Sequence, residues 1–271
     1  MYKLITCDLD ETLLNSSDRK VSAKNVEAIH KAREKGVKFV PATGRPYDSI
    51  TGTLTELGLV GLPNEYVISF NGGAITENKN SKLLHFDGIT FELAEQLFNR
   101  GLNYDVCIHI YTLDTVYVYN FVQNEKDYLA GRMEVEEFFD KDINFLKDTK
   151  IVKALFVNTN QEYLNQIERD LKDITGDVDV SYSSNRYIEF NHKGVTKGAG
   201  LRRLAELLNV DIKDTISIGD NFNDLSMIQA AGLGVGVANC VDGIKPHCDY
   251  ITKANCDESA IAEVIEKFVL K

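Results

Sequence analysis

Short apolar runs alternate with helical patterns at the beginning of the chain. The runs "YKLIT", "VKFV" and "YVISF" are rich in residues that favour β-strands. Between the first and second runs, Ser22 is predicted to cap a helix that Gly36 ends. Between the second and third runs, another helix is predicted over residues 50–57. Strands separated by helices favour a parallel sheet with crossover helices. This alternation constrains the fold more than any other feature of the sequence.

The middle of the chain has a different pattern. The segment "VCIHIYTLDTVYVYNF" alternates around a turn at residues 113–114, which predicts an antiparallel hairpin. "IVKALFVN", "VDVSYSS" and "RYIEF" are further predicted strands, and residues 164–174 carry one apolar helical stripe. We expect His109, Tyr111, Tyr117 and Tyr119 of the hairpin to pack inside this region rather than to face a substrate. Many strands with few helices indicate a separate α+β domain.

The α/β pattern returns near the end of the chain. A helix is predicted after Lys197, and "DTISIGDNFNDLSM" has the pattern of a strand, a turn and a helix. We therefore predict a discontinuous α/β core, residues 1–82 and 190–271, with an α+β domain of residues 83–189 inserted in it. A dinucleotide site at "GLGVGV" is rejected, because no third glycine opens a helix there.

Composition excludes several classes of protein. The 271 residues have a net charge of −11, which argues against a broad nucleic-acid surface. No apolar run is long enough to span a bilayer, and the N-terminus lacks the pattern of a signal peptide. The five cysteines form no CxxC pair and have no zinc spacing, so we expect reduced thiols in a cytoplasmic protein. The sequence carries no indication of an oligomeric state.

Polar residues cluster at or beside the predicted strand ends. In open parallel sheets ligands bind at the carboxyl ends of the strands, so these residues are candidates for one common site. If a helix starts at Asp220, Asp224 lies four residues on and on the same side. The candidates are Asp8, Asp10, Thr12, Thr43, Gly44, Arg45, Lys197, Asp220, Asn223 and Asp224.

Phosphoryl transfer through a carboxylate nucleophile requires such a set. Asp8 and Asp220 offer hard oxygen ligands suited to Mg²⁺, and Asp8 can attack phosphorus to form an aspartyl phosphate. Asp10 would protonate the leaving oxygen and later deprotonate the hydrolytic water. Thr43, Lys197 and the backbone N–H groups after Asp8, beginning with Leu9, can bind the phosphate oxygens.

Four motifs occur in a fixed order, namely "DLDETLL", "ATGR", "GVTKG" and "GDNFNDLSM". They resemble the four motifs of the haloacid-dehalogenase-type phosphatases. The inserted region between "NGGAI" and "IEFNHKGVTKG" resembles the Cof-like subgroup, whose large cap domain is inserted at that position. The resemblance implies a Rossmann-like core with a mobile α+β cap that selects the substrate. The chain departs from many relatives at Glu11, where they carry glycine.

The same resemblance implies roles for particular residues. It implies that Mg²⁺ is held by the Asp8 carboxylate, the Asp10 main-chain carbonyl and Asp220. Asp224 and Asn223 would then support the metal or its waters. It also implies that Asn71 lies near the phosphate and that Arg45 reaches toward the substrate. From their places at the strand ends, Thr12, Gly44 and Asn223 are further candidates for binding the substrate or its phosphate.

The leading hypothesis is a Mg²⁺-dependent phosphomonoesterase. Its partners would be small phosphorylated metabolites, above all sugar phosphates. The alternatives are a phosphomutase, a flavin or pyridoxal phosphate phosphatase, and a non-catalytic protein that binds a metabolite. Simpler interpretations of single motifs also exist: Asp8 and Asp10 could form a solvated turn, Lys197 could be a surface lysine, and Asp220, Asn223 and Asp224 could only cap a helix.

Overall fold

The first apolar run forms strand β1, next to the centre of a parallel sheet. The computed structural model describes residues 1–271. All pairings in this sheet are parallel, and Leu4–Cys7 pairs with strands on both sides. The strands, in spatial order, are β14 (Tyr250–Ile251), β13 (Leu233–Gly236), β12 (Thr215–Gly219), β1 (Leu4–Cys7) and β2 (Lys38–Pro41).

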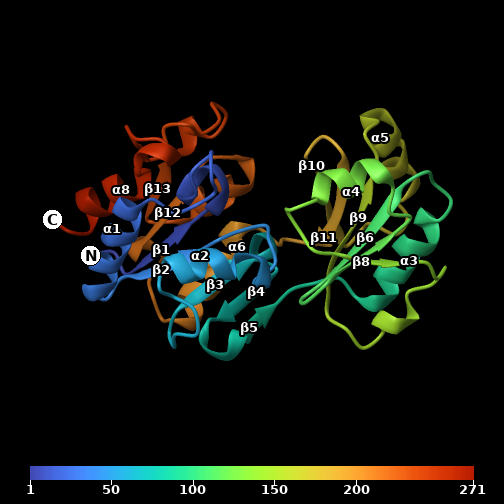
Figure 1. Ribbon diagram of the computed structural model, residues 1–271, viewed down its shortest axis with the longest axis horizontal. Helices are drawn as coiled ribbons and strands as arrows, with labels where there is room; N and C mark the ends of the chain where they lie inside the picture. Colours follow the sequence, from blue (N-terminus) through green and yellow to red (C-terminus); the bar gives the residue numbers. More distant parts are fainter. The chain divides into compact units, whose positions relative to one another are not determined.

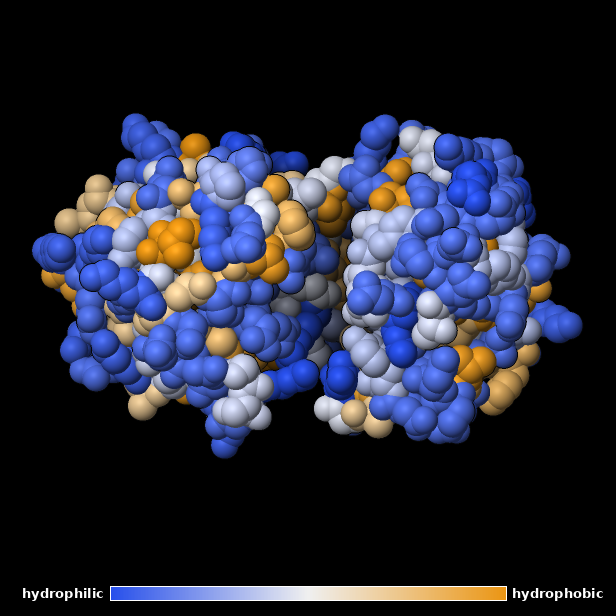
Figure 2. All heavy atoms as spheres, turned by 90° about the horizontal axis from the view of Figure 1, so that it is seen from above, coloured by the Kyte–Doolittle hydropathy of each residue, from blue (hydrophilic) through white to orange (hydrophobic).

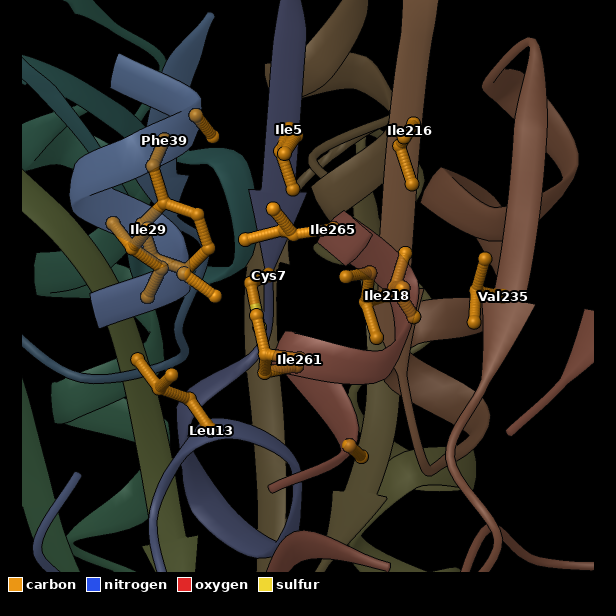
Figure 3. Packing of buried hydrophobic residues seen from close by; sticks show 14 of the residues in the cluster. Ile5, Cys7, Leu13, Ile29, Phe39, Ile216, Ile218, Val235, Ile261 and Ile265 are labelled. Carbon is orange, nitrogen blue, oxygen red and sulfur yellow. The ribbon is translucent and has the colours of Figure 1, made fainter. Parts of the chain in front are cut away.

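Helices cover both faces of this sheet (Figure 1). Isoleucines of β1 and β12 pack with α1 and α8 on one face, where Ile261 and Ile265 reach the strands (Figure 3). Leu4 and other residues of the opposite face pack with α6 and α7. As predicted, Ser22 caps the first helix, because its side chain accepts a hydrogen bond from the Asn25 N–H. The helices are α1 (Ala23–Glu34), α2 (Thr51–Glu56), α6 (Lys197–Leu207), α7 (Leu225–Ala230) and α8 (Ala260–Phe268).

The third apolar run is not a full member of the parallel sheet. Strands β3 (Tyr66–Ser69), β4 (Ala74–Glu77) and β5 (Lys82–Phe86) form an antiparallel sheet, and the parallel bridge Ala42–Ile68 links this sheet to the end of β2. The short turn after β3 reverses the chain, so that β4 pairs with it directly. The third run is therefore parallel to the end of β2 at this bridge, as predicted, but its ladder of hydrogen bonds is the antiparallel one with β4, which the sequence analysis did not predict.

The chain divides into two compact units. Unit 1 consists of Met1–Phe86 and Thr196–Lys271, and unit 2 of Asp87–Val195. These limits differ from the boundaries at 82 and 190 proposed from the sequence. Strand β5 pairs with β4 and therefore belongs to unit 1. Strand β11 (Tyr187–His192) pairs with β9 (Ile151–Val157) and β10 (Val178–Ser183) and belongs to unit 2.

Unit 2 is a six-stranded sheet with helices. All pairings are antiparallel except that of β7 with β8. The predicted hairpin is present as β6 and β7, and its His109 and Tyr111 are buried. The strands in spatial order are β10 (Val178–Ser183), β11, β9 (Ile151–Val157), β6 (Cys107–Thr112), β7 (Val116–Tyr119) and β8 (Glu136–Phe138), and the helices are α3 (Phe91–Gly101), α4 (Gln123–Leu129) and α5 (Gln161–Asp170).

The surface is mainly polar on the face drawn in Figure 2, where hydrophobic residues form separate patches. No helix combines the length and the apolar character needed to cross a lipid bilayer. All five cysteines are free thiols.

Candidate active site

Asp8 follows directly after β1 and is 7% exposed. Its backbone N–H donates to the Ile218 carbonyl of β12 (3.0 Å), so the end of β1 stays paired with the neighbouring strand. The chain then makes a tight turn over Leu9–Leu13, in which Glu11 has a left-handed backbone with φ of 58°. The Leu9 side chain is buried in the hydrophobic core, which leaves only its backbone for a ligand.

The turn also connects two strand ends. The Thr12 hydroxyl donates to Asp220 Oδ1 at 2.8 Å, although the two residues are 208 positions apart. Thr12 is fully buried, so this hydrogen bond fixes the orientation of the Asp220 carboxylate.

Lys197 lies at the start of α6 and is completely buried. Its Nζ donates to Asp8 Oδ1 and, at 2.6 Å, to Asp224 Oδ1. Burial alone would lower the pKa of Lys197, but the two carboxylates outweigh this effect and raise it. The ammonium group therefore stays charged. Thr196 caps the helix by accepting from the Ala199 N–H at 3.1 Å.

Asp220 and Asp224 are close together, but not because they share a helix. Asp220 lies between β12 and a short turn that ends at Asp224, and α7 begins only at Leu225. Asp224 Oδ2 accepts from the backbone N–H groups of Asp220 (2.9 Å) and Asn221 (3.1 Å). No helix starts at Asp220 itself. The bonds from Asp224 cap the short 3-10 helix Phe222–Asp224, which leads into α7, so Asn223 and Asp224 lie in a helical turn after the strand, in agreement with the predicted order of strand, turn and helix.

Asp8, Asp220 and Asp224 form one acidic cluster, with a ligand oxygen of each within 4.8 Å of the others. Burial raises the pKa of Asp8 to about 8, with Lys197 opposing the shift and Asp224 adding to it. Burial also raises the pKa of Asp220 to about 6, and Asp224 adds to the effect. The cluster therefore disfavours its own full ionisation and is suited to a bound cation.

The loop after β2 joins the loop after β3. The Thr43 N–H donates to the Ile68 carbonyl, and the Asn71 N–H donates to the Thr43 carbonyl, both at 2.9 Å. A Cβ on Gly44 would lie 3.2 Å from Asn71 Oδ1, so glycine allows the close approach of the two loops. Asn223 Nδ2 donates to Asn71 Oδ1 at 3.4 Å, which connects this pair of loops to the Asp220–Asp224 turn.

Asp10 and Arg45 form an ion pair across two of these loops. The Asp10 carboxylate thus contacts a guanidinium rather than the acidic cluster. Its side chain is 47% exposed, and that of Arg45 is 28% exposed, so both remain accessible. The Arg45 N–H also donates to Thr43 Oγ1 at 3.1 Å, which fixes the start of the loop.

Comparison with known proteins assigns the chain to a family. Its sequence matches the haloacid dehalogenase-like hydrolases over residues 5–265. The chain belongs to this family. "Putative phosphatase YxeH" of Bacillus subtilis is 30% identical over 271 residues, which cover 100% of this chain and 99% of that protein. The 5-amino-6-(5-phospho-D-ribitylamino)uracil phosphatase YcsE of the same organism is 29% identical, with 99% of this chain and 96% of that protein covered.

A solved structure shares the fold along almost the whole chain. A haloacid dehalogenase-like hydrolase from Bacteroides thetaiotaomicron superposes with a TM-score of 0.86 at 30% identity, covering 98% of this chain and 99% of that one. The family and the fold class predicted from the four motifs are thereby confirmed. The phosphatase names of the relatives agree with the prediction of a phosphomonoesterase.

For this haloacid dehalogenase-like hydrolase, Glu11 occupies a backbone conformation that glycine adopts at lower cost. That conformation accounts for the glycine which the resemblance places at this position in many relatives. The Glu11 side chain is exposed and makes none of the contacts within the acidic cluster.

Several residues that support the site were not predicted from the sequence. A Cβ on Gly219 would overlap the Asp224 side chain, and one on Gly72 would overlap the Thr196 carbonyl at the start of α6. The Ser226 hydroxyl accepts from the Gly198 N–H at 3.0 Å and so links α6 to α7. Asn239 contacts the Leu9–Leu13 turn. The glycines in and near the motifs were the available signal, because tight packing is a common reason for glycine.

Proposed function

We propose that this protein is a Mg²⁺-dependent phosphomonoesterase that acts on small phosphorylated metabolites, most suitably sugar phosphates. The observation that carries the proposal is the buried Lys197 ammonium, bonded to Asp8 and Asp224, beside a cluster of three carboxylates. A structural ion pair needs one carboxylate for one ammonium. The excess of negative charge instead suits a site that binds a cation and a phosphate together.

The donor set fits Mg²⁺. When all three carboxylates are ionised, they and the Lys197 ammonium leave two negative charges, which a divalent cation would balance, and all donors are oxygens. Asp8, Asp220 and the Asp10 main-chain carbonyl would hold the ion. Both Asp224 oxygens already accept hydrogen bonds, so Asp224 supports the site from behind. When bound, Mg²⁺ would reduce the repulsion between the Asp8 carboxylate and the phosphate.

In the first step an Asp8 oxygen attacks phosphorus, and the bond from phosphorus to the leaving oxygen breaks. Asp10 donates its proton to that oxygen, so the product leaves as an alcohol. Two of the three N–H groups of Lys197 are used by carboxylates, and the third is available for a phosphate oxygen. The Thr43 hydroxyl and the Leu9 N–H bind further oxygens.

In the second step water attacks the aspartyl phosphate. Asp10, now deprotonated, takes a proton from the water while the bond between Asp8 and phosphorus breaks, and inorganic phosphate is released. Arg45 is suited to orient the deprotonated Asp10 carboxylate for this step, because the two side chains already form an ion pair. The name of the relative YcsE includes a phosphate on a ribityl chain, which supports a sugar-like substrate class.

The test is phosphate release from a panel of sugar phosphates, nucleotides, flavin mononucleotide, pyridoxal phosphate and an aryl phosphate, with Mg²⁺ and with EDTA. We expect release only with Mg²⁺, and none from Asp8→Asn. The exposed Asp177→Asn in unit 2 is the matched control and should behave as wild type. Equal rates for wild type and Asp8→Asn would refute the mechanism. Conversion of a hexose phosphate into an isomer, without free phosphate, would instead indicate a phosphomutase.

A further inference from the structure

Asn239 lies in the loop after β13 and connects two distant segments. Its Nδ2 donates to the Glu11 carbonyl at 2.7 Å, and its Oδ1 accepts from the Cys256 N–H at 3.0 Å. The residue is exposed, yet both ends of its amide are bonded. Asn239 itself lies outside the four sequence motifs, and the proposed chemistry does not use it.

The carbonyl that Asn239 binds belongs to the peptide between Glu11 and Thr12. The residue that precedes Glu11 is Asp10, the proposed acid and base. The residue that follows it is Thr12, whose hydroxyl orients Asp220. Glu11 has φ of 58° and ψ of 10°, a left-handed conformation that is unfavourable for a residue with a Cβ. A hydrogen bond to its carbonyl is a direct means of keeping this peptide in place.

The segment that carries Asn239 also binds the backbone around the other acidic residues. The Val237 N–H donates to the Gly219 carbonyl at 3.2 Å, and the Val241 N–H donates to the Asp220 carbonyl at 2.9 Å. Residues 237–241 therefore bond both to the Asp10 turn and to the Asp220 turn. A shift of Asn239 would change the position of Asp10 relative to the acidic cluster.

We propose that Asn239 is a positioning residue that fixes the Asp10 carboxyl for proton transfer to the leaving oxygen. This inference rests on the proposed function. The proton matters most when the leaving group is an alkoxide, which is a poor leaving group unless it is protonated. An activated aryl leaving group departs with little protonation. Loss of Asn239 should therefore change the preference between leaving groups, and not only the overall rate.

The experiment compares kcat/KM for 4-nitrophenyl phosphate and for the best alkyl phosphate, because kcat/KM includes the departure of the leaving group. Asn239→Asp keeps the acceptor for Cys256 and removes the donor to Glu11. We expect it to lower kcat/KM for the alkyl phosphate by about tenfold or more, and for the aryl phosphate by less than about threefold. Asp10→Asn should show the same preference more strongly. The exposed Asn209→Asp, with the same change in charge, should leave both values unchanged.

Asn239→Ala removes both hydrogen bonds and decides the question if Asn239→Asp does not fold. An equal fall for both substrates, or no fall for either, would overturn the positioning role while leaving the phosphatase proposal intact. Absence of phosphate release by the wild-type protein with every substrate would overturn both proposals together.

Discussion

His109 is a buried polar residue of unit 2 whose replacement tests the physical account of that unit. It lies in β6, is fully buried, and neither of its ring nitrogens has a hydrogen-bond partner. The charged groups that face it are Glu125, whose Oε1 lies 3.7 Å from Nε2, and Lys153 of β9. Glu125 already accepts from Tyr187 (2.6 Å) and Arg186 (2.8 Å), so it is bonded without His109.

The pKa of His109 determines how the stability of the protein should depend on pH. Burial lowers this pKa from 6.5 to about 3, and Lys153 contributes in the same direction. The pKa of His109 is lower in the folded state than in the unfolded state. The free energy of unfolding is therefore not reduced by His109 above pH 6.5, where the ring is neutral in both states, and it falls as the pH is lowered from 6.5 toward 3. Each pH unit below 6.5 lowers the free energy of unfolding by about 1.36 kcal/mol, so at pH 5 the loss would be about 2 kcal/mol. Glu125 favours the protonated form, so this value is an upper limit.

His109→Leu removes the titrating group at similar volume. At pH 7.5 we expect the free energy of unfolding to stay within about 1 kcal/mol of wild type, because the lost nitrogens make no hydrogen bonds. Between pH 7.5 and 5.0 the wild type should lose up to about 2 kcal/mol more than the variant. Urea unfolding followed by far-ultraviolet circular dichroism at both pH values measures this difference.

Parallel pH dependence of the two proteins would refute this account of His109. A large loss of stability in the variant at pH 7.5 would also contradict it, since it would show that the ring nitrogens are bonded in solution. If instead His109→Leu changed kcat/KM for the substrate without changing stability, the residue would have a binding role, contrary to the packing role expected from the sequence.

Three further predictions concern unit 1. Lys197→Met should abolish phosphate release and, without metal, lower the free energy of unfolding by about 3–5 kcal/mol, because buried carboxylates lose their counter-charge. In thermal melts Mg²⁺ should restore part of this stability, and a melting temperature equal to that of the wild type without metal would contradict the ion-pair geometry. Gly219→Ala should lower the free energy of unfolding in urea titrations by about 1–3 kcal/mol, since the new Cβ overlaps Asp224. Gly176→Ala, with open space around it, should lower it much less, and equal losses would contradict the packing around Gly219. Glu11→Gly should keep its activity and change stability by less than about 1 kcal/mol, because relief of the left-handed strain opposes the entropy cost of glycine; a large destabilisation would show that the side chain has a structural role.

The parts of the fold and site that could be predicted depend on local patterns. Strand β1 and the carboxylate after it follow from an apolar run that ends in Asp8, and the same reasoning places Asp220 after β12. Because parallel strands end at one edge of the sheet, the proximity of these two residues also follows. The helix beginning at Lys197 is equally local, since Thr196 provides its cap.

The parts that could not be predicted depend on contacts between distant segments. The turn from Asp220 to Asp224 is set by side-chain hydrogen bonds to backbone N–H groups, which residue spacing does not distinguish from a helix. The contact between Asn239 and Glu11 joins residues 228 positions apart, and an asparagine in a loop indicates only a turn. The pairing of β3 with β4 depends on a short turn whose Asn71 has a left-handed backbone.

All the candidate residues for the phosphate chemistry belong to unit 1, although they come from both ends of the chain. Each proposed chemical group there is fixed by a second group: Lys197 by two carboxylates, Asp220 by Thr12, and Asp10 by Arg45. Such a site is arranged before a substrate binds, so its geometry does not depend on the identity of the leaving group. If unit 2 selects the substrate, as the family resemblance implies, substitution of those of its residues that contact the substrate should change KM and kcat/KM from one phosphate ester to another, while the effect of Asp8→Asn stays complete for every substrate.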